Sequence, residues 1–268
     1  MAVLGKERPG GWWVTIRWIW VRVGLLAGVV FMGWSLLAYR ATGVAREALN
    51  SDARVEVTDR QDHWVFAPRG QTADAGLIFY AGALVDPVAY APLARAVAER
   101  GYPVLLVELP RRAAFGGADG AAPLTRAINA TLGLPDVSHW VVAGHSRGGK
   151  VAATLARTNA GALAALVLIG TSHLRDFSLA NSRLQVTQIY GTRDTVADVE
   201  KVHQARRNLP PATRDVRIDG GNHSQFGHYG FQPGDWPATI SRDQQQRITV
   251  DALVAVLAWV TSASAESR

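Results

Sequence analysis

The chain has 268 residues, 48% of them hydrophobic and 19% charged, a balance that excludes a disordered chain and suits one large α/β domain. It contains no cysteine, which excludes disulfides, cysteine-ligated zinc and a cysteine nucleophile. The net charge of +6 comes from arginines that are mostly single and scattered, without interleaved aromatic residues, so we expect no nucleic-acid partner.

The first predicted element is an uncharged apolar segment, Val23–Tyr39, which we expect to form one transmembrane helix. At about 1.5 Å per residue this helix would be about 25 Å long, slightly shorter than the hydrocarbon core of a bilayer. Aromatic residues of the kind found at membrane interfaces lie near both ends: Trp18, Trp20, Trp34 and Tyr39. The short tail before it, residues 1–22, carries closely spaced basic residues, which favours a cytosolic N-terminus and a domain outside the membrane.

Other interpretations of this segment stay open. A small-x-small pattern at Ala41 and Gly43 is compatible with a cleaved signal peptide, although the apolar stretch is longer than a usual signal core. A buried helix of a soluble domain is another alternative. Gly24 and Gly28 form a GxxxG pair, which would allow a weak homodimer through the helix.

Residues 40–52 are expected to form a short helical or irregular connector, residues 53–262 one α/β domain and residues 263–268 a C-terminal tail. The domain alternates short apolar runs with amphipathic stretches, which is typical of a mostly parallel sheet with helices on both faces. The expected strands are Trp64–Ala67, Leu77–Ala81, Val104–Glu108, Trp140–Ala143, Ala165–Ile169, Val186–Tyr190 and Asp215–Ile218. The expected helices are Tyr90–Arg100, Leu124–Leu132, Gly149–Asn159, Val196–Asn208 and Arg242–Val260, the last beginning near a Ser241 cap. The interval between Ile169 and Val186 is too short for a large cap domain.

The strongest motif is GHSRGG at residues 144–149, which follows an apolar strand and opens an amphipathic helix. This is the strand–turn–helix context of a G-x-S-x-G nucleophile elbow. Ser146 must occupy a sharp, strained turn, and side chains at positions 144 and 148 would collide where strand and helix approach closely. The serine hydroxyl would project above the sheet, and the backbone N–H of Arg147 would stabilise an oxyanion at the helix N-terminus.

A serine hydroxyl needs a base to take its proton, and we assign this role to His223. It ends the run GGNH, in a loop after the last expected strand. His228 is the main alternative, and His173 is a further one that would instead line the pocket. The remaining histidines lie within or beside predicted elements: His63, His139, His145 and His203.

The base in turn needs an acid that holds its tautomer and stabilises the imidazolium. Asp194 ends the run YGTRD directly after an expected strand, and Asp198 and Asp219 are the alternatives. The resulting chain order of serine, aspartate and histidine is that of the α/β-hydrolases.

A second oxyanion donor is expected from the loop at residues 80–84. Gly82 lets the backbone turn tightly toward the site, and the N–H of Ala83 or of Leu84 would be the donor. We therefore expect the oxyanion hole to combine one of these groups with the N–H of Arg147.

Four stretches carry a family resemblance: FYAGALVDPVAYAPLARAVAERGYPVLLVELP, GHSRGG, IYGTRDTVA and GGNHSQFGHYGFQPGD, which together span most of residues 77–236. The domain resembles the α/β-hydrolase superfamily, specifically the small proteins grouped near dienelactone hydrolase and, among them, membrane-anchored bacterial serine hydrolases. The resemblance implies the α/β-hydrolase fold and assigns a catalytic triad to Ser146, Asp194 and His223. It departs from dienelactone hydrolase, whose nucleophile is cysteine, and this departure puts that lactone chemistry in doubt.

The expected activity is hydrolysis of a small-molecule or lipid-like carboxylic ester through an acyl-enzyme on Ser146, with no metal and no organic cofactor. The sequence contains no H-E-x-x-H, no P-loop and no G-x-G-x-x-G after a strand. A non-catalytic binding or scaffold protein on the same fold, and acyl transfer to an acceptor other than water, are the alternatives. The segment Phe226–Trp236 would shape the mouth of the pocket or simply pack as a long loop.

Overall fold

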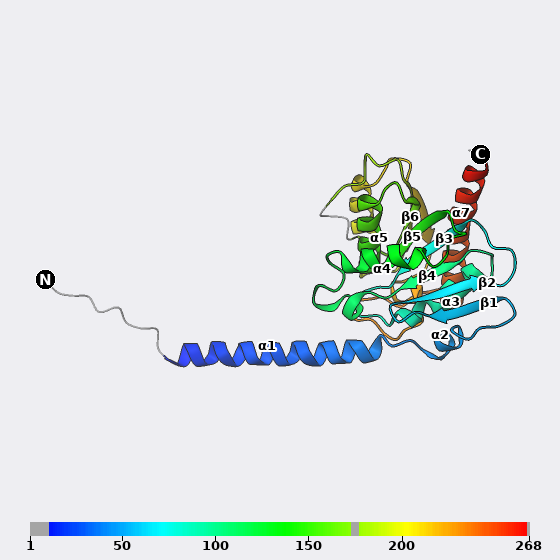
Figure 1. Cartoon of the computed structure of the whole chain (residues 1–268). Helices are drawn as coiled ribbons and strands as arrows, with labels where there is room; N and C mark the ends of the chain where they lie inside the picture. The colour runs from blue at the N-terminus through cyan, green and yellow to red at the C-terminus, as the bar shows by residue number, and fades with distance from the viewer. Residues whose placement is uncertain (1–10, 173–176, 267–268) are drawn as a thin grey trace. The chain divides into compact units, whose positions relative to one another are not determined.

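The structure, a computed structural model, describes residues 11–172 and 177–266. It divides into two compact units, Met1–Ala38 and Tyr39–Arg268 (Figure 1). The second unit is built around one mostly parallel sheet covered by helices, so the expected fold class is confirmed.

The first unit contains a single described helix, α1 (Gly11–Ala38), of 28 residues. It begins well before Val23, where we expected the transmembrane helix to start, and it includes Arg17 and Arg22. Its length and hydropathy are sufficient to cross a membrane, and a signal sequence near an N-terminus would pass the same test.

The sheet of the second unit has the strand order β1-β2-β4-β3-β5-β6-β7-β8. Its strands are β1 (Val55–Asp59), β2 (His63–Pro68), β3 (Ala75–Tyr80), β4 (Val104–Val107), β5 (His139–His145), β6 (Leu163–Ile169), β7 (Gln185–Gly191) and β8 (Arg214–Ile218). Strand β2 pairs antiparallel with both β1 and β4. All pairs from β4 to β8 in this order are parallel. The central strands read as continuous apolar runs because helices bury both of their faces.

Helices α3 and α7 pack together on one face of the sheet, and α4 and α5 pack together on the other (Figure 1). The α-helices are α2 (Gly43–Glu47), α3 (Ala91–Ala98), α4 (Ala122–Thr131), α5 (Arg147–Thr158), α6 (Val199–Ala205) and α7 (Arg242–Glu266), and the 3-10 turns are η1 (Pro87–Tyr90), η2 (Pro110–Gly116), η3 (Arg206–Asn208) and η4 (Ser224–Phe226). Helix α7 is also long and apolar enough to span a membrane, but Leu253 and Leu257 are buried against the sheet, so it is a core helix of the domain. Ser241 caps it as expected, since its hydroxyl accepts a hydrogen bond from the N–H of Gln244.

All seven expected strands are present, and β1 is an additional strand that we did not predict. It pairs only with β2, at the edge of the sheet, and just one of its five residues is buried. The connector at residues 40–52 contains the short helix α2 and packs on the domain, where the Arg95 side chain donates to the Ala48 carbonyl and binds Asp52. The connector is thus a part of the second unit rather than a free linker.

Because β3 to β8 are parallel, the loops that follow them meet at one edge of the sheet. Ser146 directly follows β5, Asp194 follows β7, and His223 follows β8. The topology therefore collects the residues expected to carry chemistry at this carboxyl edge.

Candidate active site

The turn between β5 and α5 has the strained geometry expected of a nucleophile elbow. Ser146 has φ 53° and ψ −120°, a positive φ that a residue with a side chain rarely adopts. A side chain at Gly144 would overlap the carbonyl group of Gly148, and one at Gly148 would overlap the carbonyl oxygens of Tyr80 and Ala81. The two glycines thus allow strand, turn and helix to approach closely enough to hold the serine in this conformation.

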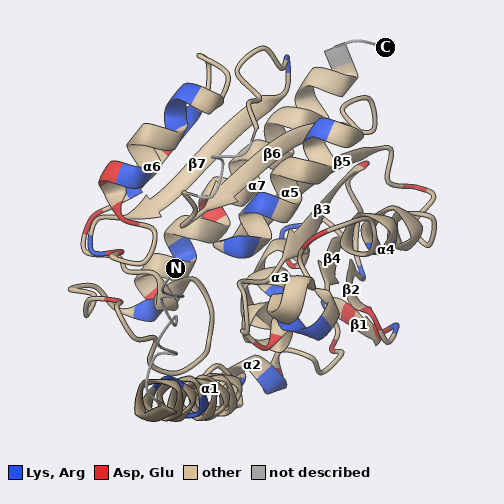
Figure 2. Cartoon of the chain, turned by 90° about the vertical axis from the view of Figure 1, so that its left-hand side faces the viewer, with Lys and Arg blue, Asp and Glu red and all other residues tan. Residues whose placement is uncertain are grey.

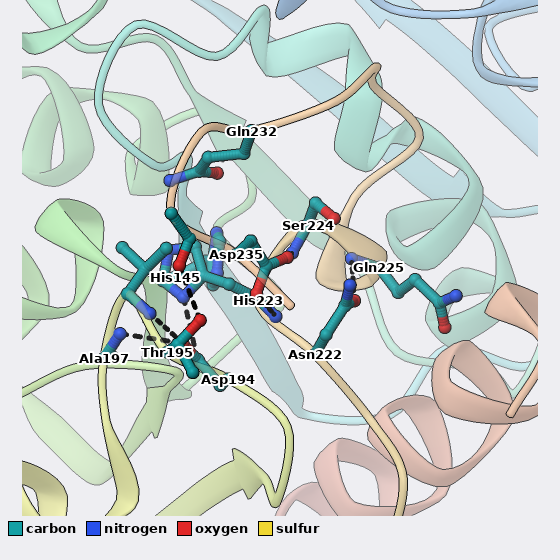
Figure 3. A network of polar contacts seen from close by, with 12 residues as sticks. His145, Asp194, Thr195, Ala197, Asn222, His223, Ser224, Gln225, Gln232 and Asp235 are labelled. Carbon is teal, nitrogen blue, oxygen red and sulfur yellow. Dashed lines mark hydrogen bonds and ion pairs between the residues drawn. The ribbon is translucent and has the colours of Figure 1, made fainter. Parts of the chain in front are cut away.

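His223 and Asp194 are joined at the carboxyl edge, as Figure 3 shows. The Nδ1 atom of His223 lies 2.8 Å from Oδ2 of Asp194, and the two side chains are almost completely buried. The other carboxylate oxygen, Oδ1, accepts hydrogen bonds from the N–H groups of Val196 (3.0 Å) and Ala197 (2.7 Å). The carboxylate is therefore fixed on both sides, and it holds the imidazole with Nε2 as the ring nitrogen left for chemistry.

The imidazole of His223 lies beside the elbow. Its ring centroid is 4.4 Å from that of His145, the residue that precedes Ser146. Among the described contacts there is no hydrogen bond between Ser146 Oγ and His223 Nε2. Serine and histidine are brought to the same site without that bond, which in many enzymes tightens only when substrate binds.

The alternative base, His228, has a different role in the structure. Its backbone N–H donates to the Ala89 carbonyl, and its carbonyl accepts from the backbone N–H of Thr42. Burial, and then the nearby Arg242, lower the pKa of its imidazole. The other alternative, His173, lies outside the described residues.

The alternative acids have local partners instead of His223. Asp198 caps α6 by accepting from the N–H of Glu200 at 2.9 Å. Asp219 forms an exposed ion pair with Arg217 at 2.8 Å. Of the three candidate carboxylates, only Asp194 bonds to a histidine of the site.

The loop after β3, residues 81–84, is called the oxyanion loop below. The N–H of Leu84 donates to the Arg112 carbonyl at 2.7 Å, and the N–H of Gly82 donates to the Tyr90 hydroxyl at 3.2 Å. The N–H of Ala83 has no acceptor within the described part of the chain. Of the two donors considered from the sequence, the N–H of Leu84 is thus already engaged, and the N–H of Ala83 is not engaged by any described residue.

The second donor, the N–H of Arg147, is in the first turn of α5, where backbone N–H groups have no acceptor inside the helix. The Arg147 side chain turns to Asp119, with 2.7 Å between guanidinium and carboxylate. Other Lys and Arg residues are distributed over α3, α6 and several loops (Figure 2). The charge of Arg147 is therefore paired, and the dipole of α5 adds a partial positive charge at the helix N-terminus.

The segment from Asp219 to Trp236, called the histidine loop below, is held by two residues that we did not single out from the sequence, Asp235 (Figure 3) and Gln245. The carboxylate of Asp235 accepts from the N–H of His223 (3.1 Å) and from the N–H of Ser224 (2.8 Å). Burial raises the pKa of Asp235, and these hydrogen bonds oppose that shift. No sequence motif pointed to this contact, because it links residues that are adjacent only after the loop folds back.

Gln245, which is fully buried on α7, is the second of these residues. Its side chain bonds both backbone groups of Asn222, accepting from the N–H at 3.0 Å and donating to the carbonyl at 2.7 Å. The histidine loop is thus fixed immediately before His223 by Gln245 and at His223 itself by Asp235.

The remainder of the histidine loop combines packed and exposed aromatic residues. Phe226 and Tyr229 are 1% exposed, whereas Phe231 and Trp236 are 68% and 58% exposed. Phe226 and Tyr229 thus pack as expected for an ordinary long loop, and a role of this segment at the mouth of a pocket stays a prediction. Among the described residues, no three His, Asp or Glu side chains are grouped as a metal site.

Comparisons with known proteins identify the family to which this fold belongs. A family model described as "Alpha/beta hydrolase family" matches residues 76–247. A search of curated proteins gives no match.

Solved structures similar to this chain include several enzymes. The esterase domain of a Rhodothermus marinus protein has a TM-score of 0.57 at 13% identity, over 78% of this chain and 98% of that one. A dienelactone hydrolase-like promiscuous phosphotriesterase from metagenomic libraries has a TM-score of 0.56 at 19% identity, over 76% and 97%. Dienelactone hydrolase from Anabaena variabilis has a TM-score of 0.55 at 16% identity, over 76% and 97%. At these identities the structures show a shared fold, and the family match covers more than half of the sequence. The chain belongs to the alpha/beta hydrolase family.

Proposed function

We propose that the protein is a membrane-anchored serine hydrolase that cleaves carboxylic esters through an acyl-enzyme on Ser146. The observation that carries this proposal is the buried His223–Asp194 pair beside a serine held at positive φ. A buried, hydrogen-bonded acid and base next to a strained serine are the parts that nucleophilic acyl transfer requires.

In the first half of the reaction, His223 Nε2 takes the proton of Ser146 Oγ as the oxygen attacks the ester carbonyl carbon. The carbonyl π electrons move to its oxygen, and the N–H groups of Arg147 and Ala83 donate to that oxyanion. Asp194 stabilises the imidazolium. The tetrahedral intermediate then collapses, the C–O bond to the alcohol breaks, and the alcohol leaves with the proton from His223.

In the second half, a water molecule replaces the alcohol. His223 removes one of its protons as the oxygen attacks the acyl-enzyme carbonyl, and the second tetrahedral intermediate releases the carboxylic acid. The proton on His223 returns to Ser146 Oγ. Atoms and charge balance without a metal or a redox partner.

Labelling with a fluorophosphonate probe tests this proposal. The folded protein is expected to bind the probe covalently at Ser146, and Ser146→Ala is expected to remain folded without labelling. Ser138→Ala is a suitable control because Ser138 is exposed and directly precedes β5, at the opposite end of that strand from Ser146. Folded wild-type protein that reacts with no fluorophosphonate would contradict the proposed mechanism.

The substrate class follows from where the chain enters the domain. The Tyr39 carbonyl accepts from the Asp86 N–H at 2.9 Å, next to the oxyanion loop, and the Thr42 N–H donates to the His228 carbonyl at 3.0 Å, within the histidine loop. Residues 39–42 are therefore bound to the histidine loop and, at Asp86, beside the oxyanion loop. We propose a lipid-like ester as substrate, and the exposed Phe231 and Trp236 on the histidine loop support this choice.

A series of p-nitrophenyl esters of increasing acyl length tests the substrate class. We expect kcat/KM of the full chain to rise with acyl length and to rise further when the ester is presented in lipid vesicles. A preference for acetate that vesicles do not change would overturn the lipid-like assignment and leave the esterase assignment in place.

We propose further that α1 is retained as an anchor, with the hydrolase domain outside the cytoplasm. A reporter fused after Arg268 is expected to be active only beyond the membrane. The N-terminal sequence of membrane-extracted protein is the companion measurement, since a new N-terminus after Gly43 would show cleavage of a signal peptide.

A further inference from the structure

The mechanism above leaves one buried histidine of the site without a role. His145 lies between Gly144 and Ser146, is fully buried, and has its Nδ1 atom 2.7 Å from the Tyr90 hydroxyl. Its Nε2 atom is also buried and has no hydrogen-bond partner among the described residues. Burial, and then the neighbouring His223, hold the pKa of His145 well below its ordinary value, so the ring is neutral at pH 7.

The hydrogen bonds around Tyr90 determine which atom carries each proton. The Tyr90 hydroxyl accepts from the N–H of Gly82 at 3.2 Å, so its own proton is free to donate to His145 Nδ1. If Nδ1 of His145 instead donated to the Tyr90 hydroxyl, both the Tyr90 proton and the Nε2 lone pair of His145 would have no partner. That arrangement is less favourable in a buried site. A directed chain therefore runs from Gly82 N–H through Tyr90 to His145.

This chain of hydrogen bonds fixes the oxyanion loop at Gly82. Gly82 immediately precedes Ala83, whose N–H is the group left for the substrate. The position that a Cβ atom of Gly82 would occupy is 3.1 Å from both the Tyr90 hydroxyl and His145 Nδ1. The backbone of the loop therefore rests directly on these two side chains.

We propose that Tyr90 and His145 are positioning residues that lock the oxyanion loop to the nucleophile elbow, so that the N–H groups of Ala83 and Arg147 face the same substrate oxygen. The two donors come from different loops, and their separation must match one oxygen atom for both to bind it. His145 is joined by one peptide bond to Ser146, while its ring contacts the ring of His223. One buried network thus connects nucleophile, base and oxyanion loop. This inference rests on the proposed esterase function.

Tyr90→Phe tests the proposal because it deletes the hydroxyl and leaves the ring. We expect kcat to fall by about 10- to 100-fold with KM changed by no more than about twofold, a smaller loss than the about 10²–10³-fold that follows deletion of an oxyanion donor. The matched control is Tyr80→Phe. Tyr80 is equally buried, and its hydroxyl donates to the Pro123 carbonyl at 2.9 Å, so the control deletes a similar hydrogen bond outside the network.

A trifluoromethyl ketone, which forms a tetrahedral adduct with the serine, separates positioning from general destabilisation. Its affinity is expected to fall by the same factor as kcat in Tyr90→Phe and to be unchanged in Tyr80→Phe. If the two variants lose equal activity, or if the inhibitor binds Tyr90→Phe as well as it binds wild type, the proposal is wrong.

Substitutions of His145 test the other end of the network and remain informative if Tyr90→Phe does not fold. The Oδ1 atom of an asparagine lies near the position of His145 Nδ1 and can accept the Tyr90 proton, whereas leucine cannot. We expect His145→Asn to keep kcat within about fivefold of wild type, and His145→Leu to fall to the level of Tyr90→Phe. Equal losses in both variants would show that the ring packing matters and the acceptor does not.

The wild-type result distinguishes this inference from the proposed function. A wild-type protein without fluorophosphonate labelling removes the esterase mechanism itself. A wild-type protein that is labelled and turns over esters, with Tyr90→Phe as active as Tyr80→Phe, removes only the positioning network.

Discussion

The nucleophile elbow and the histidine loop hold the proposed nucleophile and the proposed base in opposite ways. The elbow is held locally at Gly144, where a side chain would overlap the carbonyl group of Gly148 in the same turn. The histidine loop is held from a distance: His223 depends on Asp194, Asp235 and, through its neighbour, Gln245. A site held by close approach of backbone segments is sensitive to any added side-chain volume. A site held by distant partners is sensitive to the loss of single hydrogen bonds.

The largest expected effect concerns the long-range partner of the base. Asp194→Asn keeps the shape of the side chain but allows the wrong imidazole tautomer and removes the charge that stabilises the imidazolium. We expect kcat for a p-nitrophenyl ester to fall by about 10⁴-fold. Asp198→Asn is the matched control, because asparagine caps a helix about as well as aspartate. A loss of less than tenfold in Asp194→Asn would remove Asp194 from the triad.

The second effect tests the local character of the elbow. The added methyl group of Gly144→Ala would overlap the carbonyl group of Gly148, which cannot move without shifting the first turn of α5. We expect the free energy of unfolding in urea to fall by about 1–3 kcal/mol, and fluorophosphonate labelling to be lost. Gly161→Ala is the control, since no atom lies within 4 Å of the position of its Cβ. Equal stability of the two variants would show that the elbow tolerates a side chain.

The third effect tests the hydrogen bonds that shape the histidine loop. Asp235→Asn keeps one acceptor oxygen but turns an amide N–H₂ group toward the N–H of His223 or of Ser224. We expect kcat to fall by about 10- to 100-fold, in line with loss of one charge-assisted hydrogen bond in a buried site. Asp219→Asn, an exposed change at the start of the same loop, is expected to keep wild-type kcat. If the two variants are equally active, the loop keeps its shape without Asp235.

The same contrast explains what the sequence could predict. The elbow is a short motif because the constraint at Gly144 is local, so Ser146 and its strained turn were accessible from residues 144–149 alone. The bond between Asp194 and His223 could be anticipated from the position of each after a strand, since parallel strands bring their carboxyl ends together.

The missed features depend on packing between distant segments. Tyr90 bonds His145 across 55 residues, and Asn222 bonds Gln245 across 23, and neither pair belongs to a spacing pattern. Strand β1 was missed because it is short and half exposed at a sheet edge, so its burial pattern is weak. In α1, the helix continues through the basic residues before the uncharged segment, and charge alone does not mark where a helix begins.

The smallest expected effect concerns His145, which lies in the elbow and contacts the proposed base. Its pKa in the folded protein lies well below the ordinary value of 6.5, with burial as the main cause and His223 as the second. Below about pH 6.5 the unfolded chain therefore binds a proton that the folded chain does not. The free energy of unfolding then falls as pH falls, by at most about 1.4 kcal/mol per pH unit for this group.

Urea unfolding between pH 7.5 and pH 5 measures this slope. His228 contributes in the same direction, because burial and Arg242 lower its pKa as well. Asp235 and Glu108 have raised pKa values and act with the opposite sign, in windows that begin at their ordinary values of 3.8 and 4.5. We expect His145→Asn to flatten the slope, while Tyr80→Phe, which removes a buried hydrogen bond outside the network, keeps it. An unchanged slope in His145→Asn would mean that burial does not keep His145 neutral. The Tyr90 hydroxyl would then lose its acceptor, Nδ1 of His145, as the pH falls.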